Sequence, residues 1–107
     1  MVSHSLIIAD AALKDLNNEI IYHRLHTSEI FAARLKKEFM NQVDSICLNP
    51  YIYPECRFLP TKTQIYRNII WGNYLIIYKI KREIVEVLSL FHTRQKPAKI
   101  KWMRKRG

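Results

Sequence analysis

The strand-rich run at residues 65–93 constrains the fold of this chain most strongly. It divides into three segments rich in Ile, Val, Leu and Tyr, a composition typical of β-strands. These segments occupy about residues 65–71, 74–81 and 84–93. The first two meet at Gly72-Asn73, and a second short turn joins the last two. Because connections this short force antiparallel pairing, the sequence predicts a three-stranded antiparallel meander.

A short strand and a first helix precede the meander. Residues 5–9 are apolar and suit a strand. Asp10 can then cap a helix over residues 11–25, where apolar side chains recur at three- and four-residue steps on one helical face. The members of this stripe are Leu13, Leu16, Ile20 and Ile21. The polar side chains between them are expected to face water: Lys14, Asp15, Asn18 and Glu19.

A second helix follows a polar break in the sequence. Thr27 or Ser28 is its expected N-cap, and Glu29 complements the helix dipole in the first turn. Asn49-Pro50 ends this helix, since the residue before a proline is driven out of the helical region. Its apolar stripe consists of Phe31, Leu35, Phe39, Val43 and Ile46. The two segments are predicted to form a helical hairpin with one apolar side.

These elements predict one α+β domain over residues 1–98. An antiparallel sheet needs an apolar cover, and the helical hairpin supplies one. We expect the N-terminal strand at a sheet edge, so that one sheet is covered by the two helices. Residues 50–64 hold three of the four prolines and no clean periodicity, which predicts a long irregular connection. Long loops in compact domains are often functional.

The positive charge of the chain is concentrated at its C-terminal end. The net charge is +9, yet residues 94–107 hold seven Lys and Arg and no acid. Residues 1–93 hold eleven bases against nine acids, a net of only +2. We therefore expect a basic tail over residues 99–107. Such a block attracts phosphates, an acidic protein or anionic lipid. The alternative is a solvated end that only maintains solubility.

Several classes of protein are excluded by missing patterns. Cys47 and Cys56 lack zinc-ligand spacing, which predicts free thiols in a reducing cytosol. No signal segment and no apolar run of ~18–20 residues is present, so we expect a cytoplasmic protein without a membrane partner. Phosphate loops and catalytic triad motifs are lacking, and no cofactor is expected. His23 and His26 could ligate a metal from one helix end, but without a third ligand we expect no metal.

The basic residues on the meander suggest a family. Arg67 lies on its first strand, and His92-Thr93-Arg94 ends its last. This order of strands and basic residues resembles the RelE/ParE toxin superfamily of bacterial toxin–antitoxin modules. The run at residues 72–78 looks more like the ParE branch, whose members poison DNA gyrase without a recognised nuclease site. The resemblance implies a type II toxin, neutralised by an antitoxin that wraps it with an extended or helical segment. The resemblance also implies that the toxin contacts operator DNA only through its complex with the antitoxin.

The ribonuclease branch of the same superfamily is the main alternative. Resemblance to those members, which cleave mRNA on the ribosome, implies that Arg67 faces the scissile phosphate and that His92 transfers protons. Glu55, in a Pro-Glu step, would act as a base. Thr93 stands where some ribonucleases carry Tyr, and the central loop lacks a dense cluster of Lys and Arg. These departures favour the gyrase interpretation.

Structural roles are open for the same residues. Arg67 could pair with Glu86 across the sheet, and His92 could be hydrogen-bonded at the sheet edge. By period two, His92 should share a face with Leu88 and Leu90. The strand aromatics either stack bases or pack the core: Tyr66, Trp71, Tyr74 and Tyr78.

The expected contacts with an antitoxin or a target lie in and beside the basic tail: Arg94, Lys96, Lys99 and Lys101. The same tail supports a function of another class, a non-toxic nucleic-acid-binding module. An acidic, antitoxin-like neighbouring reading frame would distinguish the toxin from this module.

Overall fold

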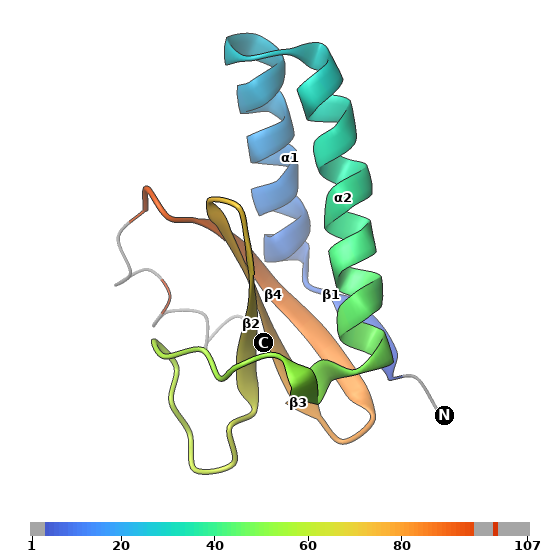
Figure 1. The fold of residues 1–107 in the computed structure, drawn as a ribbon, viewed down its shortest axis with the longest axis vertical. Helices are drawn as coiled ribbons and strands as arrows, with labels where there is room; N and C mark the ends of the chain where they lie inside the picture. Colours follow the sequence, from blue (N-terminus) through green and yellow to red (C-terminus); the bar gives the residue numbers. More distant parts are fainter. Residues whose placement is uncertain (1–3, 96–99, 101–107) are drawn as a thin grey trace.

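The structure, a computed structural model, describes residues 4–95 and residue 100. It is an α+β domain in which two long helices lie over one face of a sheet (Figure 1). The elements in chain order are β1 (Ser5–Ile8), α1 (Asp10–His26), α2 (Glu29–Leu48), the 3₁₀ helix η1 (Pro50–Ile52), β2 (Tyr66–Trp71), β3 (Tyr74–Lys81) and β4 (Ile84–His92). The predicted order of a strand, a helical hairpin and three strands is confirmed.

The four strands form one sheet in the order β1-β4-β3-β2. β2, β3 and β4 form the predicted antiparallel meander, and β1 joins β4 in parallel at one edge. β2 is the opposite edge. The turn between β2 and β3 places Gly72 at a φ of 58°, a left-handed conformation that costs glycine little.

The helix caps differ partly from the prediction. Ser28 caps α2, and its hydroxyl oxygen accepts a hydrogen bond from the Phe31 amide at 3.1 Å. We had expected Asp10 to cap α1, but it does not. Ala9 is the N-cap and Asp10 is the first helical residue. In that position its carboxylate complements the helix dipole rather than a free amide.

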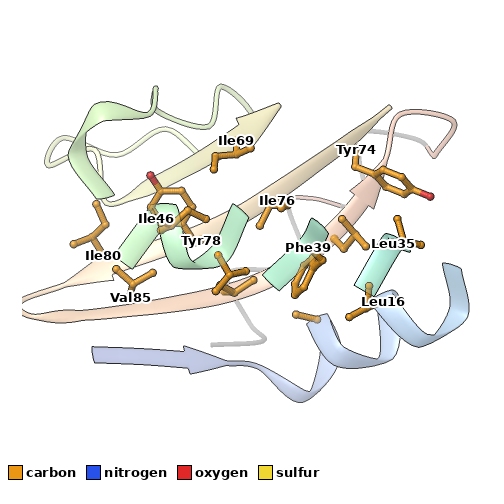
Figure 2. Packing of buried hydrophobic residues seen from close by; sticks show 14 residues of the cluster. Leu16, Leu35, Phe39, Ile46, Ile69, Tyr74, Ile76, Tyr78, Ile80 and Val85 are labelled. Atoms are coloured by element: carbon orange, nitrogen blue, oxygen red, sulfur yellow. The ribbon is translucent and has the colours of Figure 1, made fainter. Parts of the chain in front are cut away.

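The helix-facing core is built mainly by α2 (Figure 2). Four of the five predicted stripe residues of α2 are fully buried, and Phe31 is half-exposed near the helix start. In α1, Leu16 is buried, whereas Leu13 and Ile21 are 42% and 52% exposed. α1 therefore uses less of its apolar stripe than α2 does. On the sheet side this core includes Ile69, Ile76, Tyr78, Ile80, Val85 and Val87.

The opposite face of the sheet is covered as well, by residues from the 50–64 connection and from the C-terminal segment. This second cluster contains Cys56, Leu59, Tyr66, Ile77, Leu88, Phe91 and Ile100. Its partly buried neighbours are Phe58, Ile65 and Leu75. The helices thus cover one face, as predicted, and an irregular segment closes the other.

A β-bulge in β4 sets which residues face each core. Tyr78 pairs with Val87 and Ile77 with Ser89, so Leu88 is an extra residue. Such an insertion breaks the alternation of side chains along the strand. The prediction that His92 shares a face with both Leu88 and Leu90 is therefore wrong. Leu90 belongs to the helix-facing core, whereas Leu88 belongs to the second cluster.

Candidate functional site

Arg67 is held by backbone carbonyls of the connection before β2. One terminal guanidinium nitrogen donates to the carbonyls of Tyr53 at 2.7 Å and Tyr51 at 3.0 Å. The Nε atom donates to the carbonyl of Gln64 at 3.2 Å. The predicted alternative of a pair with Glu86 is wrong. A planar group with donors in a fixed fork suits carbonyls converging from two sides, and Arg67 thereby joins both ends of the connection.

Glu55 lies inside this same connection. Its carboxylate Oε2 accepts a hydrogen bond from the Thr61 amide at 3.1 Å. Its backbone forms an isolated antiparallel bridge with Arg67 at the outer edge of β2. The carboxylate therefore stabilises a turn of its own loop.

His92 lies at the end of β4, as expected, and because β4 is a central strand the alternative of a histidine at the sheet edge does not apply. Its Nδ1 accepts two hydrogen bonds from Arg94, from the backbone amide at 2.9 Å and from Nε at 3.1 Å. The proton of the neutral ring must then reside on Nε2. The ring also meets Tyr74 edge-on at 5.0 Å. Burial, followed by the Arg94 charge, lowers the pKa of His92.

His92 belongs to a group that we name the α1–sheet polar cluster: Glu19, Tyr22, His23, Tyr74, His92 and Arg94. The Tyr74 hydroxyl donates to Glu19 Oε1 at 2.8 Å, which leaves its oxygen to accept from His23 Nε2 at 3.0 Å. Burial, strengthened by the Glu19 hydrogen bond and charge, raises the pKa of Tyr74. Together these contacts fix the C-terminal half of α1 against the ends of β3 and β4.

Arg94 connects the chain after β4 to this cluster. Its guanidinium donates to the Tyr22 hydroxyl at 3.2 Å and lies 4.9 Å from the centre of the Tyr22 ring. It also approaches Glu19 Oε1 at 3.9 Å. The Arg94 side chain is 54% exposed, so its other donors are open to solvent or to a partner.

The α1 side of the cluster was not predicted from the sequence. Glu19 and Asp15 were expected to face water, and both bind the sheet instead. Glu19 accepts from Tyr74, and Asp15 Oδ2 accepts from the Ser89 hydroxyl at 2.7 Å. The available signal was the spacing of Glu19, Tyr22 and His23, which places three polar-tipped side chains on one helical face.

The three predicted ribonuclease residues do not come together. In the sheet register Arg67 is paired with Tyr78 and Tyr78 with Val87. His92 pairs with Tyr74 and Tyr74 with Trp71, so His92 is level with a residue four positions beyond Arg67, a distance of about 13 Å along a strand. Glu55 is bound within its own loop beside Arg67. The Arg67 guanidinium is hydrogen-bonded to carbonyls at the β2 edge, whereas the His92 ring contacts Tyr74 and Arg94.

Two hollows adjoin these residues. The larger, about 500 Å³, opens on the loop-covered face and is lined by Pro54, Glu55, Arg57, Phe58, Asn68, Ile70, Leu75, Phe91, Thr93 and Gln95. The smaller, about 290 Å³, lies between the helical hairpin and the β2–β3 turn. His92 lines the smaller hollow and Glu55 lines the larger one, so the two candidate acid–base groups face different hollows.

The remaining predicted site residues divide by position. Arg94 is placed in the polar cluster, whereas Lys96, Lys99 and Lys101 lie outside the described residues. Both ring nitrogens of His23 are hydrogen-bonded, to Tyr74 and Thr27, which removes the support for a metal bound by His23 and His26. Within residues 4–95 and 100, no three potential metal ligands gather. In the same part of the chain, neither helix has the length and apolarity needed to cross a bilayer.

A helical hairpin over a four-stranded sheet of this order, with a meander ending in His-x-Arg, is the arrangement that the resemblance to the RelE/ParE superfamily implied. Residues 6–97 match the family described as the ParE toxin of the type II toxin–antitoxin system parDE, and the chain belongs to that family. No curated protein sequence matches it at a significant level.

Solved structures that share the fold include the following two. One is a chain of the chromosomal ParDE TA system from P. aeruginosa, with a TM-score of 0.69 and 13% identity. That match covers 84% of this chain and 96% of the other. The second is a chain of the toxin–antitoxin complex RelBE2 from Mycobacterium tuberculosis, with a TM-score of 0.57 and 18% identity over 86% of this chain and 93% of the other.

Proposed function

We propose that this toxin stops bacterial growth by poisoning DNA gyrase in the cytoplasm. Membership of the ParE family supports a toxin role. The observation that carries the choice of target is the engagement of Arg67 with three backbone carbonyls. A guanidinium used in this way commits three of its five N–H donors to the backbone, which leaves only the other terminal nitrogen for a scissile phosphate. A toxin that acts by binding needs no assembled acid–base pair.

A cognate antitoxin is the second partner that we propose. Both structural neighbours come from toxin–antitoxin assemblies, which supports a partner of this kind. The seven bases of residues 94–107 offer an acidic partner a concentrated positive field. Arg94 projects from the polar cluster at the start of this segment, and Lys96, Lys99 and Lys101 would extend the contact. Operator DNA would be bound through the toxin–antitoxin complex.

A ribosome-dependent ribonuclease is the second candidate, and one observation favours it. Nδ1 of His92 accepts from Arg94, so Nε2 carries the proton of the neutral ring and can donate a hydrogen bond to a substrate oxygen. His92→Ala would then lower the cleavage rate by on the order of 10²–10⁴. Under the gyrase proposal the same change alters toxicity only where His92 touches the target.

The test is induction of the toxin without its antitoxin, followed within minutes by pulse labelling of DNA and protein synthesis. We expect DNA synthesis to fall first, and growth to resume when the adjoining antitoxin gene is co-expressed. His92→Ala should remain toxic, with His26→Ala, on the exposed end of α1, as the matched control. Translation that stops first, together with loss of toxicity in soluble His92→Ala alone, would establish the ribonuclease instead. Normal growth at confirmed soluble expression would remove the toxin proposal.

A further inference from the structure

The smaller hollow, of about 290 Å³, is lined largely by aromatic rings. On the sheet side, the ring centres of Trp71 and Tyr74 lie 5.4 Å apart at the two ends of the β2–β3 turn. On the helix side, His23 of α1 and Phe31 of α2 lie 4.6 Å apart. His92 completes the lining, edge-on to Tyr74. Both layers of the domain thus supply an aromatic pair to the same hollow.

Part of this aromatic surface is not used to fill the core. Tyr74 and Leu35 belong to the helix-facing core (Figure 2). Phe31, by contrast, is 42% exposed, and Trp71 is only partly buried. An open aromatic face attracts a cation or a planar group. The position of the hollow gives the exposed Phe31, which the apolar stripe of α2 predicts to be buried, a possible use.

Glu38 carries the only formal charge among the described residues that line this hollow. Its carboxylate pairs with Arg34 at 3.3 Å, and the two side chains are 44% and 70% exposed. An ion pair with this much exposure contributes little stability, so Glu38 can exchange Arg34 for another cation at small cost. The His92 ring is neutral, because its Nδ1 accepts hydrogen bonds from Arg94. The lining therefore has a negative character although the chain as a whole is basic.

The combination of aromatic faces and one carboxylate selects the chemistry of the ligand. A carboxylate repels an anion such as phosphate and gains nothing from a neutral apolar group. Among cations, a guanidinium fits better than an ammonium group, because it is planar. It can stack on a ring while its fork of N–H donors pairs with the carboxylate.

We propose that this hollow receives an arginine side chain of a protein partner, with its guanidinium stacked on the aromatic rings and paired with Glu38. One stacked cation and one exposed ion pair give a dissociation constant only on the order of millimolar, so a free guanidinium compound would bind weakly. A protein can add contacts with exposed apolar side chains. Leu25 and Ile30, 73% and 76% exposed, lie within two residues of His23 and Phe31. The inference does not depend on whether gyrase or the ribosome is the target.

Fluorescence of Trp71 tests the site directly. Trp102→Phe leaves Trp71 as the only tryptophan of the full chain. The probe is N-acetyl-arginine amide, titrated at about 0.15 M salt, where a Debye length of about 8 Å screens the net charge of +9. We expect a saturable change in emission in the millimolar range. N-acetyl-citrulline amide has nearly the same shape without the charge, and should bind at least about fivefold more weakly.

Variants of the lining separate the two parts of the contact. Glu38→Gln removes the ion pair and should weaken binding of the arginine probe at least about threefold. Glu83→Gln is the matched control, since Glu83 is exposed in the β3–β4 turn at the other end of the sheet. Phe31→Leu keeps an apolar side chain but removes the ring, and should weaken binding by a similar factor. Unchanged thermal melting would show that all three variants fold.

The use of the site by a protein is tested in cells. Either growth arrest by the induced toxin or its rescue by the adjoining antitoxin gene should be at least about threefold less sensitive to expression level in Glu38→Gln than in Glu83→Gln, in proportion to the loss of binding. This result, together with the solution preferences, supports an arginine from a partner. Arrest and rescue that are unchanged in Glu38→Gln would overturn the partner.

The solution measurements decide the rest. Equal binding of the arginine and citrulline probes, or equal binding by Glu38→Gln and Glu83→Gln, would overturn the guanidinium site. Saturation at micromolar concentrations of the arginine probe, with arrest and rescue unchanged, would make a free small cation the occupant and overturn the assignment to a protein. A chain that never arrests growth but keeps these binding preferences would remove the proposed function and support the site.

Discussion

The two faces of the sheet are both buried, but they are closed in different ways. Over the first face, two regular helices place side chains at helical spacing against strand residues of period two. The second face is covered by an irregular segment and Ile100, and a hollow of about 500 Å³ remains beside it. The helix-covered face has a smaller hollow of about 290 Å³ beside the β2–β3 turn, so the irregular cover leaves the larger unfilled space. The two faces of the sheet therefore differ in how completely their covers pack against the strands.

Large-to-small substitutions on the two faces should show the largest effects. Phe39→Ala, in the fully buried helix-facing core, should lower the free energy of unfolding by about 3–5 kcal/mol, because α2 and the sheet cannot collapse into the space. Leu59→Ala, in the loop-covered cluster, should cost nearer 2 kcal/mol, the low end for such changes, since the loop can relax.

Denaturant unfolding of the two variants checks this difference. A loss at Leu59 equal to the loss at Phe39 would mean that the irregular segment packs as rigidly as the helices. The distinction between the two faces would then have no energetic basis.

Substitution of Arg67, which lies at the boundary between the two faces, should have an effect of intermediate size on stability. Arg67→Ala removes the donors for the carbonyls of Tyr51, Tyr53 and Gln64, and should cost about 1–3 kcal/mol of stability. Arg67→Lys keeps the charge but loses the planar fork, so it should recover only part of that loss. Thermal melting with amide exchange of residues 50–64 measures both. Full stability with complete loss of toxicity in Arg67→Ala would instead return this residue to a role in phosphate binding.

Most of the fold could be predicted from the sequence, because each element has a local pattern. The meander follows from strand composition and short turns, and the hairpin from two apolar stripes. The bulge at Leu88 has no such pattern, and it changes which residues of β4 share a face. The alternative pairing of Arg67 with Glu86 failed for a related reason: the actual acceptors are backbone carbonyls, which every residue has.

The candidate site was less accessible than the fold. His92 and Arg94 were singled out by their position at the end of the meander, and the structure brings them together. Of their α1 partners, Glu19 was expected to face water and Tyr22 was not considered. A polar residue on a helix normally faces water. Only the packing of α1 against β3 and β4 gives these side chains partners. The family resemblance supplied the toxin class, which no residue pattern gives by chemistry alone.

The smallest predicted effect is a pH dependence that originates from His92. Burial and the Arg94 charge lower its pKa in the folded state. The charge of Glu19 raises this pKa, and His23 lowers it further. The Tyr74 ring from β3 contacts His92 edge-on, and Tyr22 from α1 is hydrogen-bonded to Arg94. As the pH falls below 6.5, the ordinary value for histidine, the unfolded chain takes up a proton before the folded chain does. His92 therefore contributes stability that is fully present above that pH and is lost on acidification toward its lowered folded pKa.

Unfolding free energies measured between pH 7 and pH 5 should consequently fall more steeply for the wild type than for His92→Gln. Arg94→Gln removes the second cause of the shift, and should reduce the slope without abolishing it. Protonation at Nδ1 would also end both hydrogen bonds from Arg94, so acidification should release Arg94 from His92. Equal slopes in all three proteins would mean that the junction between β4 and α1 is held by packing alone. It would then resemble the helix-covered core, whose apolar contacts do not titrate, and the polar cluster would add no pH sensitivity to that face.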